Sequence, residues 1–175
     1  MKRNLINNIL IVLPLLCLQL TGSGCARMGY TLGASLPPGV KSVHVPPFQN
    51  ASDEPTIETA ATKATIEEFQ KDGSVKVVSE ENADAIINVK ITSVKLEIVS
   101  LNRDNTQKTK EYRLKIGATV EFLRRKTNEV ILKRDVEGEY RMTPKGDMSA
   151  AKKLTIPLAS KDLAHKIVEC VVEYW

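Results

Sequence analysis

The sequence predicts an α+β fold, a two-layer sandwich of two helices packed on one face of a mixed, mostly antiparallel sheet of four to five strands. Residues 85–140 contain long segments that alternate apolar and polar side chains, which is typical of strands with one buried face. Apolar residues recur at helical spacing in residues 57–69 and 163–174. Amphipathic helices and a half-buried sheet hide their apolar sides by packing on each other, which predicts two layers.

The first elements of the domain are short. Residues 42–45 alternate and predict a strand that ends at Pro46 and Pro47, because proline has no N–H to donate. We expect a helix to open within residues 52–55 and to end at Asp72 and Gly73, where glycine supplies a left-handed cap. The apolar face of this helix consists of Ile57, Ala60, Ala61, Ala64 and Phe69. Val75, Val77 and Val78 then predict another short strand.

Three long strands follow. The first, residues 85–98, moves its apolar residues from odd to even positions, so we expect a β-bulge near Thr92 and Ser93. The second alternates throughout residues 111–122, which indicates antiparallel pairing with one wet face. The third keeps even phase at Val130, Leu132, Val136 and Tyr140, with Arg134 interrupting the predicted buried face.

The connections and the last helix complete the domain. Residues 124–128 predict a hairpin loop in which Asn128 takes a positive φ, whereas the loop over residues 102–109 is longer and polar. Pro157 opens the final helix, or residues 149–156 extend it towards the N-terminus with a kink at that proline.

The N-terminus has the pattern of a secretory signal peptide. Lys2 and Arg3 precede an apolar run over residues 9–18, which is too short to span a bilayer, and small residues follow before Cys25. Cys25 behind Ser23 and Gly24 resembles the bacterial lipobox. That resemblance implies a signal peptide over residues 1–24, and a diacylglyceryl group and an N-acyl group on Cys25. The alternative is a secreted protein in which this cysteine is incidental.

The mature chain has the size of one domain and nearly balanced charge. Removal of residues 1–24 leaves 175 − 24 = 151 residues and 25 − 2 = 23 basic against 21 acidic side chains. This balance argues against nucleic-acid binding. We expect residues 25–39 to be a tether and residues 40–175 to form one domain. Cys170 would be the lone thiol, a core residue without a disulfide partner.

The sequence contains no pattern typical of an enzyme. His44 and His165 stand apart, with no cysteine or carboxylate at ligand spacing, which argues against a metal site. No nucleophile elbow or phosphate-binding glycine loop is present. We therefore expect no catalysis and no cofactor beyond the acyl groups on Cys25.

Several short motifs occur in a recognisable order over the mature chain. They are residues 29–30, 36–43, 45–50, 67–69 ahead of Gly73, 77–78, 81–85 and 111–114. In order and spacing they resemble LptE-type lipopolysaccharide-assembly lipoproteins. The resemblance implies a fold of two helices and a mostly antiparallel four-stranded sheet. It further implies an outer-membrane lipoprotein that plugs the LptD β-barrel and assists delivery of lipopolysaccharide to the outer leaflet. Ala26, rather than Asp, after the cysteine fits the outer membrane.

A basic cluster is the sharpest binding hypothesis. Arg124, Arg125 and Lys126 at the hairpin tip would grip the phosphates of a lipopolysaccharide head group, because Arg donors match phosphate oxygens in pairs. The loop residues Arg103, Lys108 and Lys110 are weaker candidates that require the fold to bring both loops together. The alternative is a solvated turn whose charges protect the sheet edge.

A different envelope lipoprotein is the competing function. Activators of cell-wall synthases and subunits of secretion channels also begin with a strand of the type found in residues 43–48, followed by a helix. They typically place further helices between later strands. Here the three long strands follow one another, which favours the lipopolysaccharide-assembly role.

Overall fold

The structure, a computed structural model, describes residues 36–101 and 110–173. The predicted signal peptide, Cys25 and the predicted loop over residues 102–109 therefore lie outside the described residues. In this part of the chain six strands form one sheet, which is accompanied by two long helices and a short 3-10 turn. The strands are β1 (Ser42–His44), β2 (Gln49–Asn50), β3 (Lys76–Val77), β4 (Ala85–Leu101), β5 (Lys110–Arg124) and β6 (Glu129–Met142). The helices are α2 (Ile57–Asp72) and α3 (Met148–Val172), and the 3-10 turn is Glu80–Asn82.

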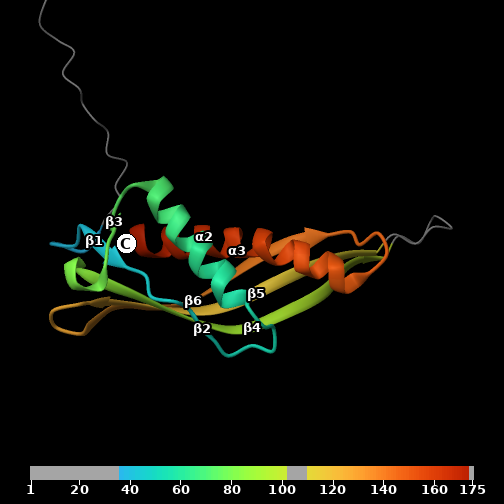
Figure 1. Cartoon of the computed structure of the whole chain (residues 1–175), viewed down its shortest axis with the longest axis horizontal. Helices are drawn as coiled ribbons and strands as arrows, with labels where there is room; N and C mark the ends of the chain where they lie inside the picture. The colour runs from blue at the N-terminus through green and yellow to red at the C-terminus, as the bar shows by residue number, and fades with distance from the viewer. Residues whose placement is uncertain (1–35, 102–109, 174–175) are drawn as a thin grey trace, which may run out of the picture. The chain divides into compact units, whose positions relative to one another are not determined.

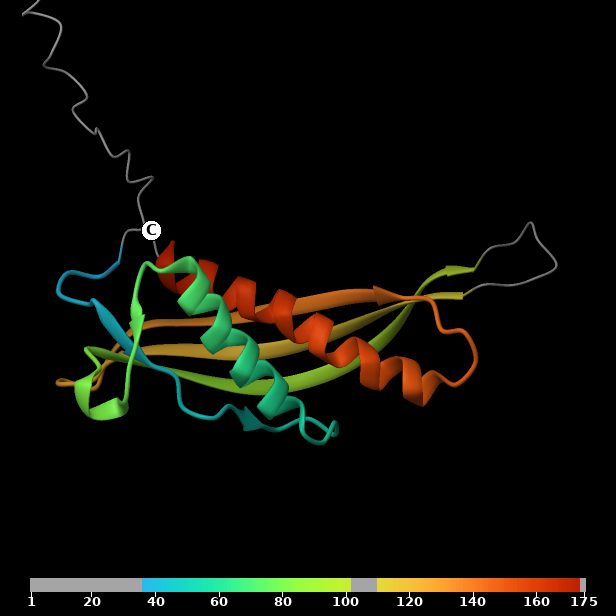
Figure 2. The ribbon, with the colours of Figure 1, turned by 45° about the horizontal axis from the view of Figure 1, so that its top comes forward.

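Both helices lie on the same face of the sheet, as Figures 1 and 2 show. The strand order is β3-β1-β4-β5-β6, and β2 pairs with β4 as well. Pairs that involve β1, β2 or β3 are parallel, whereas β4, β5 and β6 form an antiparallel meander. The predicted α+β sandwich is confirmed. The sheet has one strand more than the four to five expected, and β2, which was not predicted, is only two residues long, too short to show alternation.

The predicted bulge in β4 is present. The pairing with β5 slips between Ile91 and Ser93, so Thr92 is the extra residue that moves the apolar side chains from odd to even positions. A second slip, between Ile98 and Ser100, was not predicted. After the first slip Val94 stands opposite Ile116, as Ile91 stands opposite Ala118, so the apolar residues of β4 stay on the same face as those of β5.

The core lies between the helices and the middle of the sheet. Its largest fully buried side chains are Ile57 and Phe69 of α2, Ile87 and Ile91 of β4, Leu114, Ile116 and Phe122 of β5, and Leu163 and Ile167 of α3. Along β6 the predicted buried face is only partly so. Leu132 is buried, but Val130 and Tyr140 are exposed. The pairing with β5 slips here, so that Leu132 stands opposite Phe122 and Val130 opposite Leu123, and Val130 therefore lies on the other face of the sheet.

The start of α2 differs from expectation, whereas the start of α3 agrees with one of the two predicted alternatives. Helix α2 begins at Ile57, after residues 52–55, because Asn50 Oδ1 accepts hydrogen bonds from the Ser52 N–H and hydroxyl and holds that segment in a turn. It ends as predicted, with Gly73 at φ 76°. Helix α3 begins at Met148 and carries Pro157 inside it, which confirms the N-terminal extension, and the Asp147 carboxylate caps it.

Candidate functional site

The basic side chains predicted to bind lipid stand at the tip of the β5–β6 hairpin. Residues 125–128 join the two strands, and the Asn128 N–H donates to the Arg124 carbonyl over 2.8 Å. Asn128 has φ 53°, which confirms the predicted positive value. A tight turn of this kind holds Arg124, Arg125 and Lys126 together at one end of the sheet.

The three basic residues differ in how they are held. Arg124 Nη1 donates to the Pro38 carbonyl (3.3 Å) and Arg125 Nε donates to the Ala83 carbonyl (2.7 Å), so both half-buried arginines brace neighbouring backbone. Lys126 is exposed. A guanidinium has five N–H donors, so each arginine keeps donors beyond the bond it makes to a carbonyl.

A carboxylate lies beside this hairpin. Asp84 Oδ2 accepts hydrogen bonds from the Lys41 N–H (3.0 Å), the Ser42 N–H (3.1 Å) and the Ser42 hydroxyl (2.9 Å). The pKa of Asp84 is held below its usual value mainly by the hydrogen bond from the Lys41 N–H, and next by that from the Ser42 hydroxyl. The positive charge of Lys126 lowers this pKa further. The Asp84 carbonyl also accepts the Arg125 N–H (3.0 Å), which ties the hairpin to the start of β4.

Of the weaker candidates, only Lys110 lies among the described residues, and it does not extend this cluster. Lys110 begins β5 and Arg124 ends it, so the two lie at opposite ends of a strand of 15 residues, roughly 45 Å apart. Arg103 and Lys108 lie outside the described residues. We call Arg124, Arg125 and Lys126 the hairpin cluster.

The sheet face turned away from the helices forms a second candidate surface. It is covered by charges of both signs from β4, β5 and β6, which we call the polar sheet face. Its charged residues are Lys90, Lys95, Glu97, Glu111, Arg113, Lys115, Glu121, Lys133, Asp135, Glu137, Glu139 and Arg141. Six are basic and six acidic, a formal charge of 6 − 6 = 0. Such a face has no excess charge with which to attract phosphates.

Ion pairs link the strands across this polar sheet face. Lys115 Nζ lies 2.9 Å from Glu137 and 3.6 Å from Glu97, and Lys133 Nζ lies 2.5 Å from Glu121. The hydrogen bond from Glu137 raises the pKa of Lys115, and that from Glu121 raises the pKa of Lys133. Both lysines therefore remain charged at any physiological pH.

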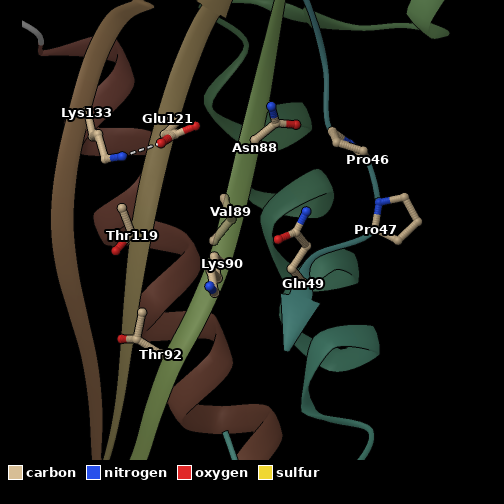
Figure 3. Close-up of a pocket in the computed structure, with 10 residues that line it drawn as sticks. All are labelled: Pro46, Pro47, Gln49, Asn88, Val89, Lys90, Thr92, Thr119, Glu121 and Lys133. Carbon is tan, nitrogen blue, oxygen red and sulfur yellow. Dashed lines mark hydrogen bonds and ion pairs between the residues drawn. The ribbon is translucent and has the colours of Figure 1, made fainter. Parts of the chain in front are cut away.

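Figure 3 shows a groove of about 550 Å³ beside this face, which sequence reasoning missed. Pro46, Pro47 and Gln49 form one wall, from the segment between β1 and β2, and β4 lies opposite. Two consecutive prolines offer no N–H to β4, which fits the interruption of pairing between His44 and Gln49. The proline pair is visible in the sequence, but by itself it predicts only the end of a strand and not a groove.

Within the described residues, no group of three or more His, Cys, Asp or Glu side chains is placed to hold a metal ion. His165 Nδ1 lies 3.3 Å from Glu68, so it links α3 to α2. Cys170 is a buried free thiol, as predicted, and burial raises its pKa although Arg134 opposes the shift. The helices of the described part of the chain are all too short or too polar to cross a membrane.

Solved structures resemble this fold at low sequence identity. A hypothetical protein from Chlamydia trachomatis matches with a TM-score of 0.54 and 11% identity, over 77% of this chain and 97% of the other. A minor lipoprotein from Acinetobacter baumannii matches at 0.51 and 12%, over 77% and 94%. Uncharacterized lipoprotein B from Nitrosomonas europaea matches at 0.50 and 17%, over 79% and 85%. At such identities the likeness supports the fold alone.

The family comparison is more specific. A search of curated proteins finds no match. The model of the LptE lipopolysaccharide-assembly family matches residues 40–170, which is well over half of the chain and includes all six strands, α2 and most of α3. The resemblance noted in the sequence motifs is thereby confirmed, and the chain belongs to the LptE lipopolysaccharide-assembly family.

Proposed function

We propose that this protein is an outer-membrane lipoprotein that partners an LptD-type β-barrel, as a plug and assembly factor for lipopolysaccharide transport to the cell surface. The family match over residues 40–170 carries this proposal, because it spans the sheet and both helices rather than one motif. Cys25 bears the acyl chains, and residues 25–39 tether the domain on the periplasmic side or inside the barrel.

The polar sheet face supports a seat within a barrel. The interior of a large outer-membrane barrel is polar and hydrated. Most charges of this neutral face already stand in ion pairs, such as Lys115 with Glu97 and Glu137, so few charges would enter that environment unpaired. We therefore place the polar sheet face against the barrel wall.

The hairpin cluster is the proposed contact to lipopolysaccharide. Arg124 reaches the Pro38 carbonyl, so the hairpin lies beside the point where the tether joins the domain. The 13 residues from Cys25 to Pro38 span at most about 45 Å, which limits how far the cluster lies from the anchored membrane. Lys126 is exposed, and donors left over on both arginines are available to phosphate oxygens.

Substitution of Lys126 tests the lipid contact more directly than substitution of Arg124 or Arg125. Replacing all three residues by Ala would also remove the backbone bonds of Arg124 and Arg125, so the decisive variant is Lys126→Ala. We expect it to weaken binding of purified lipopolysaccharide several-fold at unchanged Tm. Lys145→Ala, an exposed lysine beyond the other end of β6, is the matched control and should bind normally. Equal binding by both variants would refute the contact.

Affinity purification of the tagged protein from native envelopes, followed by mass spectrometry, tests the central proposal. A large outer-membrane β-barrel in stoichiometric amount is the expected result, with an unrelated tagged lipoprotein as control. Recovery of a cell-wall synthase or a ring-forming secretion subunit instead would favour the competing function and retire the barrel partnership.

A further inference from the structure

The second half of β4, residues 92–101, which we call the far half, is an open edge of the sheet. On its outer side β4 pairs with β1 and then with β2, and the last pair is Asn50 with Ile91. In Figures 1 and 2 β4 runs on well past β2. Beyond Ile91 no other strand of the described residues pairs with this side of β4. Its unpaired N–H and C=O groups offer a template for another strand.

This edge is apolar, which distinguishes it from the opposite edge of the sheet. Leu96, Ile98 and Val99 are 37%, 56% and 38% exposed. On β6, the other edge, charged side chains are dense, and the Asp162 carboxylate accepts the Glu139 N–H over 2.8 Å. Charges and a covering carboxylate protect an edge from pairing. The far half of β4 has fewer charges and more exposed apolar surface, so it is built as a pairing edge.

We infer that this edge pairs antiparallel with the same edge of a second copy of the chain, on a twofold axis through Leu96. In that register Leu96 faces its own copy and Val94 faces Ile98 on the helix side. On the polar side Lys95 faces Glu97, and the symmetry makes this ion pair twice. The inference concerns the chain by itself and does not depend on the proposed barrel partnership.

The residues of the edge select this register over its neighbours. A shift by one residue would place apolar Leu96 opposite charged Glu97 or Lys95. Those charged side chains point to the other face of the sheet from Leu96, so this register does not match the faces of the two copies. A shift by two residues would place Glu97 opposite Glu97 in one direction and Lys95 opposite Lys95 in the other. Like charges directly opposite destabilise a strand pair. Only the register centred on Leu96 matches both the faces and the charges.

Charge reversal and its rescue test this pairing. The full-length chain, purified in mild detergent, should show a concentration-dependent dimer in sedimentation measurements. Lys95→Glu turns both ion pairs into repulsions and should raise the dimer Kd roughly tenfold. The double variant Lys95→Glu with Glu97→Lys restores opposite charges and should restore the dimer. Lys90→Glu, on the same face but beside β2, should leave the Kd unchanged.

The charge-reversal variant should fold normally. Lys95 is exposed and stands opposite Lys115 of β5, so Lys95→Glu replaces a like-charge pair within one copy by an opposite pair. Its Tm should therefore hold or rise, which separates loss of the dimer from unfolding. A wild-type chain that remains monomeric at every concentration, as it would if the edge served another protein's strand, overturns the inference.

Cysteine pairing tests the register itself. Leu96→Cys lies on the axis, about 4.5–5.5 Å in Cα separation from its copy, and should form a disulfide-linked dimer on mild oxidation. Ile98→Cys is at a more exposed position, but its copy would be four residues along the partner strand, roughly 13 Å away, so this variant should not form the disulfide. Equal crosslinking of both variants would overturn the register.

Discussion

At the scale of single residues, Gly138 determines how closely α3 approaches the sheet. A Cβ at this position would lie 2.4 Å from the Leu163 backbone nitrogen and 2.5 Å from its Cα. Backbone cannot rotate away as a side chain can, so the helix and β6 would have to separate. Gly138→Ala should therefore destabilise the protein by about 1–3 kcal/mol.

A second glycine provides the control for that prediction. At Gly117 an added Cβ would lie 2.8 Å from Ser93 Oγ, which belongs to a side chain that can turn aside. Gly117→Ala should cost clearly less than Gly138→Ala in urea unfolding of the two variants. Equal losses would mean that close backbone approach is not what requires glycine in β6.

The Asp84 carboxylate makes stability depend on pH in a defined direction. Its pKa is lowered in the folded chain, so its stabilising contribution is complete above the ordinary value near 3.8 and is lost as the pH falls below that value. Asp84→Asn should melt below wild type at neutral pH, and the gap in Tm should shrink in acid. Asp53→Asn, in an exposed loop, is the charge-matched control. A gap that stays constant down to pH 3 would contradict this account.

At the scale of elements, Pro157 interrupts the hydrogen bonding of α3. Proline inside a helix removes one N–H and clashes with the carbonyl four residues earlier. Pro157 is exposed, so replacing it loses no core packing. Pro157→Ala should raise the stability by about 1–3 kcal/mol, measured by thermal unfolding. A lower Tm would show that the two halves of α3 need the proline to follow the sheet.

The elements that sequence reasoning predicted well are those whose pattern repeats. β4 and β5 alternate over many residues, and the change of phase at Thr92 was enough to predict the bulge. The start of α2 was missed because side-chain bonds from Asn50, rather than local propensity, hold the preceding segment. In the candidate site, the hairpin and its positive φ at Asn128 follow from local sequence. The brace from Arg124 to Pro38 joins residues 86 apart, and no local pattern reveals such a contact.

At the scale of the whole molecule, three surfaces have proposed tasks, of which the polar sheet face and the far half of β4 share Lys95 and Glu97. The hairpin cluster lies beside Pro38 and the start of β4, the polar sheet face is neutral, and the far half of β4, at the opposite end of the strand, is an apolar edge. The strand order makes this separation possible. Because β1 and β2 pair with only one half of the β4 edge, the other half remains available to a partner strand.

The proposed membrane anchor on Cys25 can be tested with two cysteine variants. Each buried methylene of an acyl chain contributes about 0.8 kcal/mol, so two or three chains hold a protein on a bilayer for long periods. We expect Cys25→Ser to lose incorporation of labelled palmitate and to move from the membrane to the soluble fraction of envelopes. Cys170→Ser removes the other thiol expected in the mature chain, which lies on the buried side of α3, and should keep both the label and the membrane location. Label retained by Cys25→Ser would mean that acylation occurs elsewhere. If Cys170→Ser lost the label at unchanged expression, Cys170 rather than Cys25 would be the acylated residue.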